Sequence, residues 1–297
     1  MRLALLLLVS LVAVGAESAP LRVVSTTTVL ADIVRQIGGG RVESLSLLKP
    51  GSDAHTYQPT PDDVKLIASA QVVVVNGLGF EGWIDQLIAA AGGQRPVVVA
   101  STGVEPMTAG VRAEGSAGHQ HTHGADPHAW QDAKNGMLFV ANIRAALAAA
   151  DPAGADDYAA WADAYSAQLR VVDAWIRKQV SSLPAERRVL VTSHDALGYF
   201  GRAYGLEVVP VEGIATGQEP DPARVVALIA LLRQRQVKAV FIESVANPKV
   251  VERIGAEGGA HLGGSLFTDS LDLPGRPAGT YIGMFLANVR TIVDGLR

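Results

Sequence analysis

The sequence predicts an α/β protein: two doubly wound α/β lobes joined by a single long rigid helix. Three observations predict this fold class. Short β-branched runs alternate with amphipathic helical patterns over residues 20–150, and the same alternation returns over residues 185–297. Between the two, a helical pattern runs without Gly or Pro over residues 156–183, inside a linking segment of residues 151–184. Strands that alternate with helices are typical of parallel sheets covered by helices.

The N-terminus has the pattern of a secretory signal peptide over residues 1–19. Arg2 precedes an apolar run from Leu3 to about Val14, which is too short to span a bilayer. Small residues follow, so we expect cleavage after Ala16 or Ala19. The alternative is a buried N-terminal helix. We therefore expect export to a periplasm.

Composition excludes several classes of protein. The 297 residues carry a formal net charge of −4 and no run of Lys or Arg, so no surface for nucleic acid is indicated. The chain has no cysteine, which excludes a disulfide scaffold, thiolate ligation of zinc, thiol catalysis and a lipidated N-terminal cysteine. We accordingly expect a protein that is not lipid-anchored.

The first lobe is predicted to contain a sheet of roughly four parallel strands. Its strand patterns are "LRVVST", "VESLSLL", "QVVVVNG" and "PVVVAST", and its helical patterns are "VLADIVRQIGG", "PDDVKLIASA" and "EGWIDQLIAAAGG". The lobe ends with a helix that begins near Ala133.

The linking helix has an aromatic and aliphatic stripe at spacings of three and four, made by Tyr158, Trp161, Tyr165, Leu169, Val172 and Trp175. Pro184 ends the helix, which would be about 40 Å long at 1.5 Å per residue. The stripe is expected to pack in the core and not to hold a cofactor. One unbroken helix should also let the lobes hinge less than flexible strands would.

The second lobe repeats the alternation. Strand patterns are "VLVTSH", "LEVVPVEG" and "AVFIES", and helical patterns are "ALGYFGRAYG", "DPARVVALIALLRQRQ", "NPKVVERIGAEGG" and "GTYIGMFLANVRTIVDGLR". No direct sequence repeat relates the two lobes.

Three histidines lie at strand ends or in strand-to-helix loops, where open α/β sheets bind ligands. His55 lies in "GSDAHTYQPTPDD", His128 in "DPHAWQD", and His194 closes the strand "VLVTSH". Three imidazoles indicate a metal site and need a fourth ligand. The candidates are Asp269, which follows a short apolar strand in "GGSLFTDSL", and Glu243, which ends "AVFIES". Glu243 is otherwise a residue beside the site or a cap of the next helix.

These motifs, together with "FIES" and "GTYIGM", resemble the zinc- and manganese-specific solute-binding proteins of ABC importers, the ZnuA/TroA/PsaA group. The resemblance covers nearly the whole chain after the signal peptide. It implies a metal site in the cleft between the lobes, with ligands on His55, His128, His194 and Asp269. It also implies, as partners, a membrane permease with its cytoplasmic ATPase.

The chain departs from the group's pattern at two positions, where Gln131 and Ala133 replace the usual Leu and Pro. This puts the local packing in doubt but not His128 as a ligand. Three imidazoles and one carboxylate suit tetrahedral Zn²⁺, whereas Mn²⁺ prefers more oxygen donors. Manganese carriers of the group often have Glu at the position of His194. We therefore expect Zn²⁺, with Mn²⁺ as the alternative.

A second histidine cluster lies in the polar, Gly-rich loop 113–124. We expect His119, His121 and His123 to form an auxiliary loop that captures zinc weakly and feeds the cleft, or receives zinc from a periplasmic metallochaperone. The alternative is a solvated loop with incidental affinity for metal.

Two other classes of function fit less well. A zinc hydrolase is disfavoured because "HTHGADPH" misses the H-x-H-x-D-H register, no H-E-x-x-H helix exists, and four protein ligands leave no open coordination position. Adjacent Ser193 and His194 would point to opposite faces of a strand and could not form a nucleophile pair. An adhesin is the other class, but nothing in the sequence resembles a dedicated adhesive module. We expect a monomer that binds metal and is not an enzyme.

Overall fold

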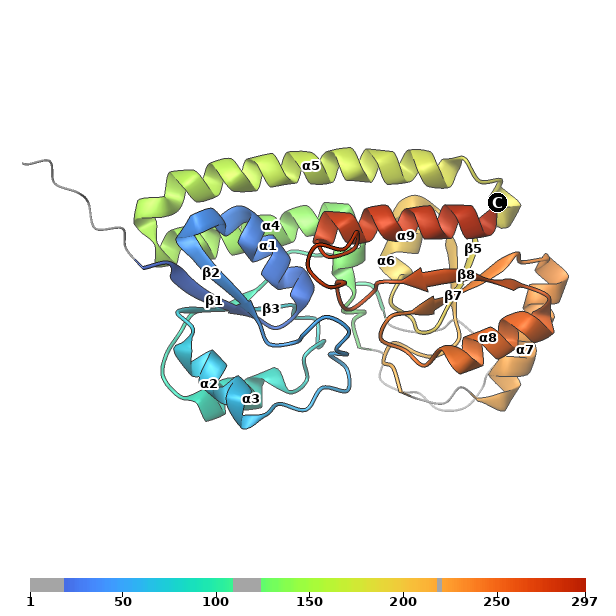
Figure 1. Ribbon diagram of the computed structural model, residues 1–297, viewed down its shortest axis with the longest axis horizontal. Coiled ribbons are helices and arrows are strands. Elements are labelled where there is room, and N and C mark those ends of the chain that lie inside the picture. The colour runs from blue at the N-terminus through green and yellow to red at the C-terminus, as the bar shows by residue number, and fades with distance from the viewer. Residues whose placement is uncertain (1–18, 109–123, 218–220) are drawn as a thin grey trace, which may run out of the picture.

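The computed structural model describes residues 19–108, 124–217 and 221–297. Within these residues the chain forms two α/β lobes side by side, as Figure 1 shows. The first lobe has a four-stranded parallel sheet in the order β2-β1-β3-β4. Its strands are β1 (Leu21–Ser25), β2 (Val42–Ser46), β3 (Val72–Val75) and β4 (Val97–Val99), and its helices are α1 (Thr28–Gly38), α2 (Pro61–Ser69), α3 (Ile84–Ala91) and α4 (Ala133–Ala150).

The second lobe has a sheet of the same topology, in the order β6-β5-β7-β8 and again parallel. The predicted fold class of two doubly wound lobes is confirmed. The strands are β5 (Val189–Thr192), β6 (Glu207–Pro210), β7 (Ala239–Glu243) and β8 (His261–Leu266), and the helices are α6 (Gly198–Tyr204), α7 (Pro222–Arg235), α8 (Pro248–Gly258) and α9 (Tyr281–Leu296).

A single helix of 27 residues, α5 (Ala155–Ser181), joins the lobes and runs along both of them (Figure 1). Its inner face buries Tyr158, Tyr165 and Leu169 completely or nearly so, while Trp161 and Trp175 are half-buried. The predicted stripe is therefore core packing. The helix extends about 40 Å at 1.5 Å per residue.

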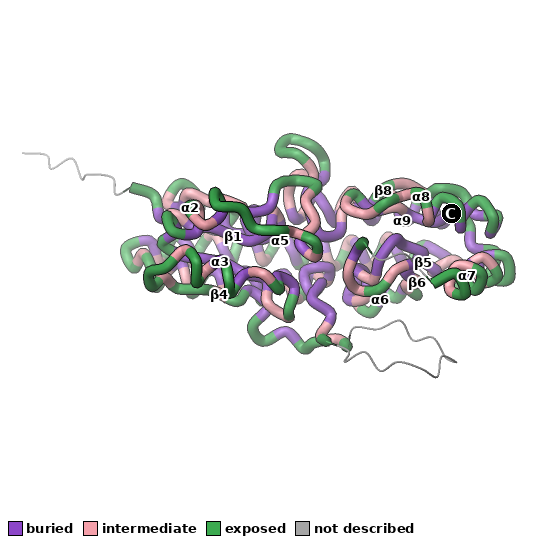
Figure 2. The backbone as a smooth tube through the Cα atoms, turned by 90° about the horizontal axis from the view of Figure 1, so that it is seen from below, coloured by how far each residue is buried: buried purple, intermediate pink, exposed green. Residues whose placement is uncertain are grey.

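The main apolar core is continuous between the lobes. It contains β1 and β3 of the first lobe, the inner face of α5, and residues of the second lobe such as Leu190, Phe241 and Leu266. Helix α9 contributes Met284 and Phe285 to the same cluster. A smaller separate cluster lies beneath α7 and α8, and buried chain runs through the centre of both lobes in Figure 2. This shared packing resists rotation of one lobe against the other.

Two predicted features lie outside the described residues. They are the signal peptide, apart from Ala19, and the loop of residues 113–124, apart from Gly124. Two described residues on either side of this loop, Thr108 and Ala125, pair in an isolated antiparallel bridge. In the part of the chain that the structure describes, no helix is both long and apolar enough to cross a bilayer.

We predict that Gly136→Ala destabilises the protein. A Cβ atom at Gly136 of α4 would lie 2.5 Å from the hydroxyl oxygen of Tyr281. Tyr281 is fully buried and donates a hydrogen bond to the carbonyl of Trp130, so it cannot swing aside. Overpacking of this kind lowers the free energy of unfolding by about 1–3 kcal/mol.

Urea unfolding of the metal-free protein measures this change. The control is Gly40→Ala, because a Cβ atom at Gly40 has no neighbour within 4 Å. We expect that control to stay within about 0.5 kcal/mol of the unsubstituted protein. Equal stability of the two variants would contradict the packing argument.

Candidate metal-binding site

The structure brings His55, His128, His194 and Asp269 together between the lobes. One ligand atom from each lies within 4.8 Å of every other. His55 comes from the loop between β2 and α2, and His128 directly precedes the short 3-10 helix Ala129–Gln131 before α4. His194 follows β5, and Asp269 follows β8. Each lobe thus supplies two side chains from the carboxyl side of its sheet, which is where open α/β sheets bind their ligands.

The distances within this cluster fit one small cation. The Nε2 atoms of His55 and His128 are 3.2 Å apart. The carboxylate of Asp269 lies 3.2 Å from Nε2 of His194, 3.5 Å from Nε2 of His55 and 3.6 Å from Nε2 of His128. Four ligands at about 2.0–2.1 Å from a tetrahedral ion stand about 3.4 Å from each other. These four of the cluster's separations, which involve both oxygens of Asp269, bracket that value, and one ligand atom of each residue lies within 4.8 Å of every other.

The side chains of the cluster are almost completely buried. The side chains of His128, His194 and Asp269 have no exposed surface, and that of His55 is 7% exposed. Both carboxylate oxygens of Asp269 and Nε2 of His194 are buried without a hydrogen-bond partner among the described residues. Buried polar atoms without partners are rare and costly. A bound cation would satisfy these atoms together.

Burial and charge shift the pKa values of the cluster in different directions. Burial lowers the pKa of His55 to about 4, more than the nearby Asp269 raises it. Burial also acts to lower the pKa of His194, but the carboxylates of Glu243 and Asp269 outweigh it and raise that pKa well above its ordinary value. For Asp269, burial acts to raise the pKa, and the histidines, His194 foremost, hold it far below its ordinary value instead.

Two further carboxylates orient the buried histidines from behind. Oδ1 of Asp126 lies 2.8 Å from Nδ1 of His128 and accepts a hydrogen bond from its backbone N–H at 2.9 Å. Oε2 of Glu243 lies 2.5 Å from Nδ1 of His194, and Oε1 accepts from the backbone N–H of His194 at 2.9 Å. Such contacts fix the ring orientation and raise the basicity of metal-binding imidazoles.

Glu243 therefore lies beside the cluster and does not cap the next helix. Asn247 caps α8, with its side-chain oxygen accepting from the backbone N–H of Lys249. The hydroxyl of Thr268 also donates to Oε2 of Glu243, at 2.9 Å. This ties the residue before Asp269 to the carboxylate behind His194.

Sequence reasoning missed the role of the aspartate two residues before each first-lobe histidine. Oδ1 of Asp53 accepts from the backbone N–H of His55 at 2.8 Å, as Oδ1 of Asp126 does from that of His128. Aspartate favours such local turns because its side chain reaches the backbone N–H two residues on. The repeated Asp-x-His tripeptide was the signal that could have found them.

Gln131 and Ala133, which depart from the pattern of the resembled group, both have hydrogen-bond partners. The side-chain amide of Gln131 donates to the carbonyl of Thr268 at 2.8 Å, beside the indole N–H of Trp130 at 2.9 Å. The backbone N–H of Ala133 donates to the hydroxyl of Tyr204 at 3.3 Å, which a proline could not do. The local packing is thus accounted for.

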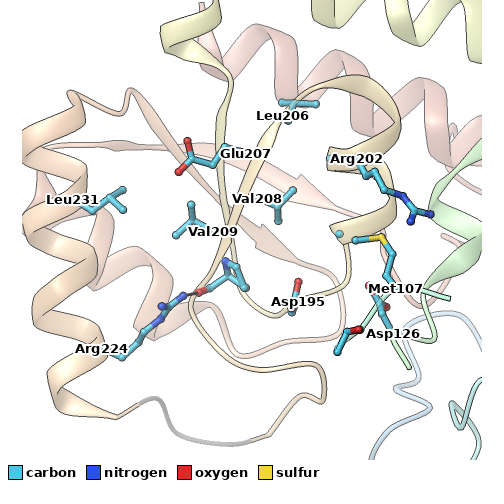
Figure 3. A pocket seen from close by; sticks show the side chains of 14 residues that line it. Met107, Asp126, Asp195, Arg202, Leu206, Glu207, Val208, Val209, Arg224 and Leu231 are labelled. Atoms are coloured by element: carbon cyan, nitrogen blue, oxygen red, sulfur yellow. Dashed lines mark hydrogen bonds between the residues drawn. The ribbon is translucent and has the colours of Figure 1, made fainter. Parts of the chain in front are cut away.

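A separate pocket of about 450 Å³ adjoins the cluster on the side of the second lobe (Figure 3). None of the four cluster residues lines it. Asp126 lines this pocket near Asp195, whose pKa is raised by burial and by the charge of Asp126. Arg224 lines the far side and donates to the carbonyl of Pro210 at 2.6 Å. Asp126 therefore both lines the pocket and contacts His128 of the cluster.

His119, His121 and His123 lie outside the described residues.

Comparisons with known proteins identify the family. The family model described as "Zinc-uptake complex component A periplasmic" matches residues 23–295. The zinc-binding protein TroA of Treponema pallidum is 37% identical over 287 residues, which cover 95% of this chain and 90% of TroA. The solved structure of TroA matches with a TM-score of 0.85 at 35% identity, covering 94% of this chain and 99% of that one.

Other relatives carry different metals in their names. The manganese-binding lipoprotein MntA of Halalkalibacterium halodurans is 33% identical over 276 residues, covering 93% of this chain and 88% of MntA. The iron-binding protein YfeA of Yersinia pestis is 35% identical over 274 residues, covering 92% of this chain and 86% of YfeA. The comparisons therefore establish metal binding without choosing the metal.

The prediction of a protein without a lipid anchor is wrong by these comparisons. Several matched relatives, MntA among them, are named lipoproteins. The prediction rested on the lack of cysteine in this sequence, which does not reveal how members of the group are retained at a membrane. Placement in the periplasm or outside the cell is supported.

The expectation that the chain is not an enzyme agrees with these comparisons, because its relatives are binding components of importers. The match covers nearly the whole chain, both lobes and the joining helix. The chain belongs to the ZnuA family, the solute-binding proteins of metal-ion ABC importers.

Proposed function

We propose that the protein is a high-affinity zinc-binding protein that delivers Zn²⁺ to an ABC importer. The observation that carries the proposal is the cluster of three imidazoles and one carboxylate with separations near those of a tetrahedron. Its ligands are proposed to be His55, His128, His194 and Asp269. Four protein ligands that exclude water suit the holding of a zinc ion and leave no open position for catalysis.

The donor set favours zinc over manganese. Imidazole nitrogen suits Zn²⁺, while Mn²⁺ favours carboxylate, carbonyl and water oxygens. Three of the four donors here are nitrogen, and His128 and His194 are each backed by a carboxylate that makes the ring a better donor.

One observation favours manganese, or a mixed specificity, as the second candidate. Both oxygens of Asp269 face the histidines, with Oδ2 toward His55 and His194 and Oδ1 toward His128. A carboxylate that binds through both oxygens raises the coordination number above four and adds the oxygen donors that Mn²⁺ prefers.

The partners follow from the family. An importer of this class consists of a membrane permease with its ATPase, and the present chain is its binding component. We propose that the chain acts as a monomer and that a metallochaperone hands it zinc, with His119, His121 and His123 as the auxiliary capture loop. Metal release would follow when the docked permease separates the ligands of the two lobes.

Competition between the two metals tests the choice of zinc. We expect the metal-free protein, mixed with equal and limiting Zn²⁺ and Mn²⁺, to retain one Zn²⁺ in native mass spectrometry. Retention of Mn²⁺ would overturn zinc specificity and leave the manganese alternative.

We predict that His194→Ala lowers zinc affinity by more than about 100-fold. Loss of a direct ligand should exceed the 10–100-fold cost of losing a group that only orients a ligand. The metal-free variant should keep the circular dichroism of the folded protein. His261→Ala is the control, because His261 is exposed at the start of β8; unchanged affinity in both variants would exclude His194 as a ligand.

We predict that zinc affinity falls as the pH falls through neutrality. The pKa of His194 is raised, so the metal-free protein holds a proton there at neutral pH that the metal must displace. Affinity should then drop about tenfold per pH unit below that pKa. His55, with a pKa of about 4, adds to the loss only near pH 4.

Calorimetry in two buffers of different ionisation enthalpy at pH 7 counts the displaced proton. Glu243→Gln removes the charge that raises the pKa of His194, so fewer protons should be released and the pH dependence should flatten. Affinity that stays constant between pH 8 and pH 6 would contradict this assignment of the proton.

A further inference from the structure

We propose that Asp53 is a positioning residue that fastens the His55 loop to the second lobe through Thr216, and that this contact sets the rate at which bound metal leaves. The inference rests on the proposed function of metal carrier. It concerns residues outside the proposed ligand set.

The carboxylate of Asp53 divides its two oxygens between different tasks. Oδ1 accepts from the backbone N–H of His55 at 2.8 Å and so fixes the backbone that carries this imidazole. Oδ2 accepts from the hydroxyl of Thr56 at 3.0 Å, within the same loop. Oδ2 also accepts from the hydroxyl of Thr216, which belongs to the second lobe. One side chain therefore links the position of His55 to the position of the other lobe.

The other Asp-x-His tripeptide lacks this division among the described contacts. The side chain of Asp126 bonds His128 twice through Oδ1, to the backbone N–H and to Nδ1. His128 is fully buried, whereas His55 is the one member of the cluster that is only partly buried. The carboxylate oxygen that contacts the second lobe thus belongs to the aspartate beside His55, the most exposed residue of the cluster.

The segment around His55 depends on such contacts because it has no regular structure of its own. Residues 47–60 contain neither helix nor strand. The indole N–H of Trp83 donates to the carbonyl of Ala54 at 3.0 Å and holds the loop to its own lobe. Apart from the contact of Asp53, the segment makes one other hydrogen bond to described residues of the second lobe. It runs from the backbone N–H of Gly51 to the hydroxyl of Ser270 at 2.9 Å.

These contacts make the His55 side the place where metal exits with least disruption. Release past His128, His194 or Asp269 would require opening the buried core that the lobes share. Release past His55 requires only that the loop 47–60 separate from the second lobe. The hydrogen bond of Thr216 to Asp53 must break for this, as must that of Gly51 to Ser270. Thr216 is 6% exposed, so little water can reach this hydrogen bond and replace it.

The test is the rate of zinc release from the loaded full-length protein into excess chelator, followed by stopped flow. Thr216→Val removes the hydroxyl and keeps the side-chain shape. We expect release to accelerate about tenfold, which corresponds to one hydrogen bond to a charged group. Association should change less than twofold, because we expect the contact to form only after the metal has entered. Thr216→Ser, which restores the hydroxyl, should return the release rate to within twofold of the original.

Thr56→Val is the matched control. It removes a hydroxyl of the same kind from the same carboxylate oxygen, but inside the first lobe. We expect its release rate to stay within twofold of the original. Equal acceleration in the Thr56 and Thr216 variants would overturn the proposal, since Asp53 would then act only through the local fold of its loop. An unchanged rate in Thr216→Val would also overturn it.

Two outcomes separate this proposal from the proposed function. If the unsubstituted protein retains no zinc or manganese in native mass spectrometry, the function of metal carrier fails. If every variant holds one metal ion and all release it at one rate, only the role of Asp53 and Thr216 fails. Should Thr216→Val not fold, Thr216→Ala removes the same hydroxyl without adding atoms and should give the same acceleration.

Discussion

The buried carboxylate of Asp269 is the constraint on which the rest of this structure depends. It has no exposed surface and no hydrogen bond among the described residues, and it faces three imidazole nitrogens at 3.2 to 3.6 Å. A buried carboxylate costs several kcal/mol unless a positive charge pairs with it, and in the metal-free protein the proton on His194 supplies that charge. A cation at the centre of the cluster would displace that proton and pair with the carboxylate directly, so the burial of Asp269 would favour its binding.

Holding such a cluster requires that two lobes keep a fixed separation. The two sheets share one topology, and residues that follow strands of both sheets meet in the cluster. Helix α5 and the continuous core behind it fix their distance, and the donors of Trp130 and Gln131 meet on the carbonyl of Thr268 beside Asp269. Small changes of separation would move nitrogen and oxygen donors that are useful only within a few tenths of an ångström.

Much of this arrangement was predictable, because local patterns specify it. Apolar runs such as Val72–Val75 specify the strands, and the polar residues that follow strands meet at one edge of a parallel sheet.

The links between the lobes were not predictable. The hydrogen bond of Thr216 to Asp53 spans 163 residues, and that of Gln131 to Thr268 spans 137. No periodicity encodes such distant pairs, since they depend on how the lobes are finally placed. Asp126 and Asp53 were overlooked although the repeated tripeptide was visible.

Tight binding and timely release place opposite demands on the same fold. A core that continues from one lobe into the other is expensive to open, and this favours retention of the metal. Release must then use contacts that are few, polar and near solvent, because these can exchange with water or with a partner at small cost. The loop of His55 meets these conditions: it lacks regular structure, its imidazole is the most exposed of the cluster, and hydrogen bonds of Gly51 and Asp53 hold it to the second lobe. A permease that competes for these few bonds could free the metal while the shared core stays intact.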